Sequence, residues 1–323
     1  MTPTQATTLT TKPALPRARA AGLWRAGLAS VLALAAAAVA SAAGAAETPA
    51  LLTLLEGEAS LIVGARAYAA APGARVPAGA LVETGAGAGL LRLEWADGAM
   101  LDLGPGTKVM LRPALAGAGA TAGRPAPLFY LLQGWAKHTQ PSAGGGQTGA
   151  AFEIAPFKGV MLSQVDEGQA VLFSEAGGAT FTPRRSGAKA VTLRAGEAAV
   201  LSGTAVPQLL PRPAPAWLQQ LPRAFRETLP SRAARFSASA APALAAQPAP
   251  SYGRLQHWLQ AEPALRRAFP ARFAELLADR TFKDAVNTRL KQHPEWEPML
   301  RPPPKPSAAS RKINAPAEPE PPR

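Results

Sequence analysis

The sequence predicts an all-β domain, a short-stranded β-sandwich or β-roll, followed by a small α-helical C-terminal module. Three observations predict this fold. Residues 90–95 and 99–103 alternate apolar and polar side chains around Asp97-Gly98, which is the pattern of a β-hairpin. Short apolar runs divided by Gly and Pro continue to residue 204. After residue 251 apolar residues recur at spacings of three and four, which is the period of a helix.

The register of the hairpin follows from its apolar face. A two-residue turn would place Leu93 opposite Asp102 and mix the two faces of the sheet. A three-residue loop of residues 96–98 instead places Leu93 opposite Leu101, so that the apolar side chains stay together. We therefore expect Gly98 to take the left-handed backbone conformation of a bulged turn.

The remaining strands are predicted from the same alternation. The first hairpin strand should be half-buried, with Arg92 and Glu94 on its polar face. Two segments rich in Gly, Ala and Pro, residues 113–127 and 140–150, are predicted to be mobile loops. The expected strands are residues 51–55, 58–63, 80–82, 90–95, 99–103, 108–111, 128–132, 135–138, 152–154, 160–165, 170–174, 179–182, 191–194 and 198–201.

Glycines mark the turns between these strands. A Gly-x-Ala pattern begins at Gly57, Gly134, Gly168 and Gly196, each time just before a predicted strand. Gly supplies the positive φ that tight turns require. The predicted structural turn positions are Gly57, Gly85, Asp97, Gly98, Gly168 and Gly196.

The two ends of the β domain, residues 47–206, are marked by changes in composition. Residues 1–46 carry four basic groups and no acid, then an apolar run and small residues. This pattern predicts a secretory signal peptide, and an uncleaved membrane anchor is the alternative. Residues 207–250 are predicted to be a Pro/Ala-rich linker with short helices, 251–300 the helical module, and 301–323 a disordered Pro-rich tail.

The residue types exclude several chemistries. The chain has no Cys and only three His, and none of the His lies in a zinc-binding motif. No nucleophile elbow or phosphate-binding loop occurs in the sequence. The pairs Asp166-Glu167 and Glu94/Asp97 flank Gly turns, so they are interpreted as solvated turn residues. We therefore expect no enzymatic activity, no cofactor and no metal.

The positive charge of the chain is concentrated in its C-terminal part. The formal net charge is +13, and residues 207–323 hold 18 basic and 9 acidic groups, whereas residues 47–206 hold 12 of each. A basic module is typical of proteins that bind anionic partners, although a solvated Arg-rich helical surface explains the charge as well. The candidate partner-binding residues are Arg223, Arg226, Arg232, Trp258 and Trp296. In the alternative interpretation, the aromatic residues form the core of the helical module.

Several different short motifs are distributed over residues 51–203. They are Leu55–Ala59, Gly79 with Glu83-Thr84-Gly85, Asp97-Gly98, Gly104-Pro105 with Lys108, Asp166–Val171 and Leu193–Glu197. Together they resemble the FecR domain of bacterial envelope proteins. The resemblance implies an all-β fold and an envelope location. Its motifs are structural glycines, so they indicate a fold more than an activity.

The resemblance also implies a regulator, but this sequence differs from the FecR regulators at its N-terminus. FecR regulators of the iron-citrate type begin with a cytoplasmic anti-sigma region. Here fewer than thirty residues precede the apolar run, so we expect no such region. The sequence therefore predicts a non-enzymatic periplasmic or exported FecR-domain binding or scaffold protein. Its expected partner is an envelope protein or an anionic cell-wall polymer, with no nucleic acid. The alternative is a membrane-retained envelope sensor of the FecR signalling type.

Overall fold

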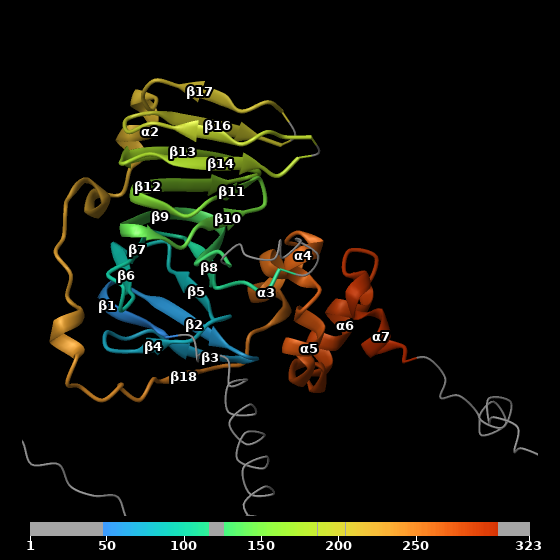
Figure 1. Ribbon diagram of the computed structural model, residues 1–323. Helices are drawn as coiled ribbons and strands as arrows, with labels where there is room; N and C mark the ends of the chain where they lie inside the picture. Colours follow the sequence, from blue (N-terminus) through green and yellow to red (C-terminus); the bar gives the residue numbers. More distant parts are fainter. Residues whose placement is uncertain (1–47, 116–125, 186, 204, 303–323) are drawn as a thin grey trace, which may run out of the picture. The chain divides into compact units, whose positions relative to one another are not determined.

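The computed structural model describes residues 48–115, 126–185, 187–203 and 205–302. These residues are mostly β-strand with short C-terminal helices, as the sequence predicts (Figure 1). The predicted signal segment, most of the predicted loop 113–127 and nearly all of the predicted tail lie outside the described residues. Among the residues described here, no helix is long and apolar enough to span a membrane.

The strands form two sheets, which we call sheet A and sheet B. Sheet A has the order β4 (Arg75–Val76), β1 (Ala50–Glu56), β6 (Leu90–Glu94), β7 (Met100–Leu103), β9 (Phe129–Gly144), β12 (Phe157–Asp166), β13 (Gln169–Ala176), β16 (Ala198–Ser202) and β17 (Gln208–Leu210). Sheet B has the order β18 (Ala246–Gln247), β3 (Arg66–Ala69), β2 (Ala59–Val63), β5 (Leu81–Thr84), β8 (Lys108–Leu111), β9, β10 (Gln147–Gly149), β11 (Phe152–Ile154), β14 (Ala179–Pro183) and β15 (Val191–Leu193). In the described part of the chain, only the pair β9–β10 is parallel.

Strand β9 belongs to both sheets. Its first residues pair with β8 in sheet B, and from Gly134 onward it pairs with β12 in sheet A. Gly134 has a φ of 89°, and a Cβ built on it would lie 2.5 Å from the Cα of Thr107. Only glycine fits this bend, because any side chain would collide with the backbone of the neighbouring turn.

The β6–β7 hairpin has the predicted register. Leu93 pairs with Leu101 and Leu91 pairs with Leu103. The N–H of Trp95 donates to the carbonyl of Ala99 at 2.9 Å, which closes the three-residue loop. Gly98 has a φ of 83°, in the left-handed region. The apolar alternation therefore determined both the pairing and the turn.

The two sheets enclose a continuous apolar interior. Side chains from both sheets meet in two clusters, one beneath the early strands and one beneath the late strands. The first includes Leu52, Leu61, Val82, Leu91, Leu93, Leu101 and Val109. The second includes Phe152, Ile154, Phe157, Met161, Leu172, Phe181 and Leu201.

The C-terminal helices cover the outer face of sheet B. Side chains of that face, such as Ile62, Leu81 and Met110, share one buried cluster with Leu255 and Phe269. The helical part contains α3 (Tyr252–Leu259), α4 (Pro263–Arg266), α5 (Phe269–Arg272), η3 (Ala274–Ala278), α6 (Arg280–Thr288), η4 (Pro294–Trp296) and α7 (Glu297–Leu300). The helices and sheet B therefore share one core.

Arg272 fastens the helices to the turns of sheet B. Its guanidinium donates to the carbonyl oxygens of Ile62 at 2.9 Å, Gly64 at 3.2 Å and Gly79 at 2.5 Å. Burial lowers the pKa of Arg272 to about 10, so the side chain still carries its charge at neutral pH. Hydrogen bonds from a charged donor are the stronger kind.

The outer face of sheet A is covered by residues 211–247, which we call the strap. It contains α2 (Pro215–Gln220), η1 (Arg223–Arg226) and η2 (Ala233–Phe236) and ends in β18 (Figure 1). Trp217 and Phe225 are buried in one cluster with Trp135 and Leu162 of the sheet. The Nε1–H of Trp217 donates to Gln164 Oε1 at 2.6 Å. Residues predicted to be a linker thus make core contacts.

The strap buries charged side chains that the sequence predicted to be on a solvated face. Arg92 and Asp102 are only 3% and 4% exposed and form a two-pronged ion pair at 2.6 and 2.7 Å. Nη1 of Arg92 also donates to the carbonyls of Leu229 at 2.9 Å and Pro230 at 3.1 Å. The prediction of a half-buried strand is wrong for β6, because the strap covers its second face.

Glu94 receives hydrogen bonds from both the sheet and the strap. Thr53 Oγ1 donates to it at 2.6 Å, the backbone N–H of Arg232 donates at 2.9 Å, and the Ser231 hydroxyl donates as well. Burial acts to raise the pKa of Glu94. The hydrogen bonds and the charge of Arg92 outweigh burial, and the pKa is lowered from its ordinary value of 4.5.

The predicted loop 140–150 is also wrong for most of its length. Strand β9 extends to Gly144, and β10 follows it. Gln140 and Gln147 are buried, where Gln140 hydrogen-bonds to the Nε2 of His138 and Gln147 donates to the Ser163 hydroxyl. Burial lowers the pKa of His138 to about 3, so this inner polar group is neutral. The Gly-rich composition of this segment predicts a loop, and it gives no sign of these buried hydrogen bonds.

We expect Gly98→Val to reduce the free energy of unfolding by ~1–3 kcal/mol, because a β-branched residue is strained at positive φ. A Cβ there would also lie 3.1 Å from Pro141 Cγ. Gly87→Val is the control, because a Cβ at Gly87 meets nothing within 4 Å. Urea unfolding of both variants measures the difference, and equal losses would contradict the strain at Gly98.

We expect Glu94→Gln to reduce the free energy of unfolding by ~1–3 kcal/mol at neutral pH, because the new amide nitrogen would face donors: either the Ser231 hydroxyl, or the Thr53 hydroxyl and the N–H of Arg232. A carboxylate whose folded pKa is lowered contributes stability above its ordinary pKa, here 4.5. It loses that contribution as the pH falls through the folded pKa. The difference between wild type and variant should therefore shrink below that pH.

Urea unfolding across a pH series measures this effect. Glu58→Gln is the matched control, because the Glu58 side chain is exposed and forms no hydrogen bond or ion pair with another described residue. A constant difference between wild type and Glu94→Gln at every pH would contradict the ionised state of Glu94.

Candidate functional site

The candidate partner-binding residues lie in two different environments. Arg223 and Arg226 are exposed on the strap, and Arg232 is half-buried beside Glu94. The side chains of Trp258 and Trp296 are almost fully buried. The two tryptophans therefore belong to the core of the helical part, which is the placement that the second interpretation of the sequence predicts.

The buried tryptophans have identifiable partners. The Nε1–H of Trp258 donates to Glu83 Oε1 at 2.9 Å, which ties α3 to β5. The Trp296 ring lies 5.9 Å from the Phe282 ring. Both side chains thus hold the helices in place, and the surface of this region is formed by other residues.

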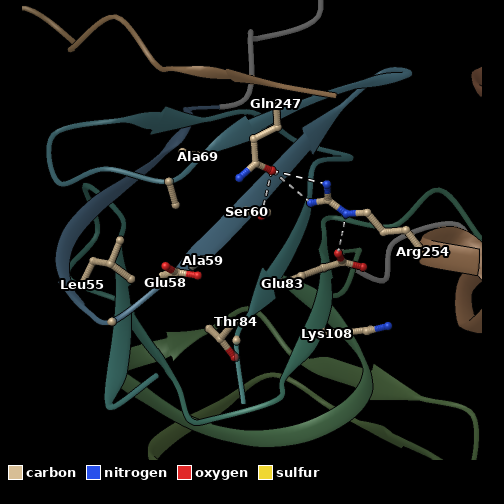
Figure 2. A pocket seen from close by; sticks show the side chains of 13 residues that line it. Leu55, Glu58, Ala59, Ser60, Ala69, Glu83, Thr84, Lys108, Gln247 and Arg254 are labelled. Carbon is tan, nitrogen blue, oxygen red and sulfur yellow. Dashed lines mark hydrogen bonds and ion pairs between the residues drawn. The ribbon is translucent and has the colours of Figure 1, made fainter. Parts of the chain in front are cut away.

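A pocket of about 510 Å³ lies where β2, β3 and β5 meet the C-terminal residues (Figure 2). Its walls come from the turn before β2, from β5 and β8, from β18 and from α3. The lining includes Gly57, Glu58, Ser60, Ala69, Glu83, Gly85, Lys108, Gln247 and Arg254. Small side chains and glycines leave the space open.

Two of the predicted turn glycines form part of this pocket. Gly57 has a φ of 89°, and a Cβ there would lie 2.9 Å from the Cα of Ala88. The N–H of Gly85 donates to the carbonyl of Glu58 at 2.9 Å. Gly168 and Gly196 have φ values of 80° and 88° and lie in turns elsewhere in the fold. Asp97 Oδ1 accepts a hydrogen bond from the N–H of Ala99 at 3.0 Å in the hairpin.

The rim of the pocket is a connected polar group. Arg254 Nε lies 3.4 Å from Glu83 Oε2, and both terminal nitrogens of Arg254 donate to Gln247 Oε1 at 3.3 Å. Ser60 Oγ donates to the same oxygen at 3.0 Å. These contacts fix Gln247 with its oxygen toward Arg254, so that its amide nitrogen faces the opposite side of the pocket (Figure 2).

Lys108 lies at the edge of the pocket beside α3. Its Nζ is 3.2 Å from Nδ1 of His257, and the same ring nitrogen is 2.7 Å from Gln133 Oε1. Burial and then the charge of Lys108 lower the pKa of His257, and the charge of Glu83 opposes them. His257 is therefore neutral at physiological pH, and Lys108 is the cation of this edge.

Sequence reasoning found part of this site. The motifs Leu55–Ala59 and Glu83-Thr84-Gly85 were singled out for their glycines, and the structure brings them together. Gln247 and Arg254 were missed, because nothing in the sequence connects them with strands more than 170 residues earlier. Among the described residues, no group of His, Cys, Asp or Glu is arranged to hold a metal ion.

The comparisons with known proteins give one kind of match. No protein-family model matches the chain, and no curated protein matches it. Two solved structures from Parabacteroides distasonis, each described as a "putative anti-sigma factor", are similar to 43% of this chain, with 14% and 13% identity and a TM-score of 0.33 each. The chain spans 64% of the length of each of those structures.

Proposed function

We propose that this protein is a non-enzymatic exported module that docks on an anionic partner of the bacterial cell envelope. One observation carries the proposal, the excess of positive over negative charge on the strap, where Glu227 pairs with Arg223 alone. Residues 207–250 contain five arginines and a single acid, Glu227. Arg212, Arg223, Arg226 and Arg235 are all exposed. The non-enzymatic assignment rests on the residue types described above.

The strap, more than the helices, supplies this charge. Residues 251–300 hold eight basic and six acidic groups. Several of these are paired: Arg254 with Glu83, Arg266 with Glu295 and Arg280 with Asp284. Arg272 is committed to the carbonyls of sheet B. The helical surface is therefore nearly balanced, and the docking face is assigned to the strap.

The distribution of the arginines favours an extended partner. They are spread along the strap from Arg212 to Arg235, on either side of the buried Trp217 and Phe225. A partner with charges at intervals, such as an anionic cell-wall polymer, would meet several arginines at once. A guanidinium suits this role because it contacts carboxylate or phosphate with two parallel hydrogen bonds.

The apolar run of residues 26–46 favours a second candidate. If that segment stays attached, the same module is held at the membrane as an envelope sensor. N-terminal sequencing of the exported protein separates the two candidates. A mature start near residues 43–47 supports the exported module, and an intact first residue in the membrane fraction supports the sensor.

We expect replacement of Arg212, Arg223, Arg226 and Arg235 by Gln to weaken binding to purified anionic cell-wall polymer roughly tenfold at low salt, because exposed ion pairs contribute a few tenths of a kcal/mol each. Co-sedimentation of the full chain with the polymer across a salt series measures the effect. The difference should shrink as salt rises, since the Debye length falls to ~10 Å at 0.1 M.

The matched control replaces four exposed basic residues of the helical part by Gln: Arg267, Arg280, Lys283 and Lys291. It removes the same net charge and should retain most of the binding. An equal loss in both variants would show that net charge alone attracts the polymer. Unchanged binding in the strap variant would overturn the proposal.

A further inference from the structure

We propose that the pocket between sheet B and α3 binds a short peptide with free amino and carboxyl ends. The pocket is separate from the strap arginines, and the proposed docking function does not use it. Its volume of about 510 Å³ lies within the usual range for small-molecule sites, ~300–1,000 Å³. The argument rests on which of its polar groups are already satisfied and which are not.

One charge pair in the pocket is internally satisfied. Glu83 accepts hydrogen bonds from Arg254 and from Trp258, and Arg254 also holds Gln247. These groups compensate one another and build the wall. They leave two charged groups in the lining that form no ion pair with a described residue: the carboxylate of Glu58 and the ammonium of Lys108, which lies opposite Glu83 in the β5–β8 pair.

The two remaining charges lie on opposite sides of the pocket. Glu58 lies on the side of Leu55, and Lys108 lies on the side of Arg254 (Figure 2). A ligand with one charge would meet a like charge at one of these sides. A ligand with an ammonium at one end and a carboxylate at the other is attracted by both.

The rim of the pocket offers a neutral hydrogen-bond donor. The Oε1 of Gln247 accepts from Ser60 and Arg254, so its amide nitrogen is the free end. Among the described residues no acceptor is bonded to that nitrogen. A peptide carbonyl between the two charged ends of a ligand is the acceptor that fits. Glu58 would accept a hydrogen bond from the ammonium of the ligand, Gln247 would donate to its carbonyl, and Lys108 would attract its carboxylate. These three roles together match a short peptide.

The pocket exists only in the assembled chain. Its lining includes the Gly57 and Gly85 turns of the β domain, whereas Gln247 and Arg254 come from the C-terminal residues. Ala59, Ala69 and Ala70 contribute only methyl groups, which leaves room for the backbone of a ligand. A bound peptide would contact both parts, and it should therefore also raise the unfolding temperature of the protein.

Isothermal titration calorimetry of the full chain with three probes tests the proposal. The probes are alanylalanine, its N-acetylated form and its C-terminal amide. We expect alanylalanine to bind with a Kd below about 1 mM and each blocked form to bind at least roughly tenfold more weakly, a loss of about 1.4 kcal/mol. Glu58→Gln should abolish the preference for a free amino end, and Lys108→Met should abolish the preference for a free carboxyl end.

Ala69→Leu fills the pocket and should remove binding, with circular dichroism and the unfolding temperature of the unliganded protein as checks on its fold. Gly87→Ala, outside the pocket lining, is the control and should bind as wild type does. Equal affinities for the three probes would overturn the peptide assignment. Absence of heat with all three, or undiminished binding in a folded Ala69→Leu variant, would overturn it as well.

Discussion

The structure depends on a set of buried charges on the outer face of sheet A. Arg92, Asp102 and Glu94 are removed from water, and an ionised group in the interior is costly unless every hydrogen bond is made. Asp102 satisfies only part of the Arg92 guanidinium, and the carbonyls of Leu229 and Pro230 complete it. The sheet and the strap therefore need each other: without the strap, the same side chains would simply be hydrated surface residues.

Local patterns carried most of the correct prediction. The hairpin register follows from alternation over a dozen residues, and it also places Arg92 opposite Asp102. No local pattern predicts that the strap covers this ion pair, because Leu229, which accepts a hydrogen bond from Arg92, lies 137 positions later in the chain. The same reason explains why the sequence of residues 140–150 predicts a loop. Their glycines allow close packing, and the partners of Gln147 lie on other strands.

In the candidate site, too, the sequence predicts the local turns and misses the contacts between distant segments. Gly57 and Gly85 were predicted as turns from their spacing, and each occupies a position where a side chain would be crowded. Trp258 and Trp296 were candidates for a surface because aromatic residues favour interfaces. Their burial shows that this interface is internal to the chain, between α3 and sheet B and among the helices. The pocket rim was beyond sequence reasoning, since β18 is only two residues long and has no strand pattern.

The pairing of β18 with β3 has a consequence for how the protein is made. A ribosome delivers β3 early and β18 about 180 residues later, so the first strands wait with an unpaired edge and an apolar outer face until the last helices arrive. Such long-range closure is slow. The outer face and the free edge of sheet B are therefore the last parts of the fold to be covered, after the C-terminal residues have left the ribosome.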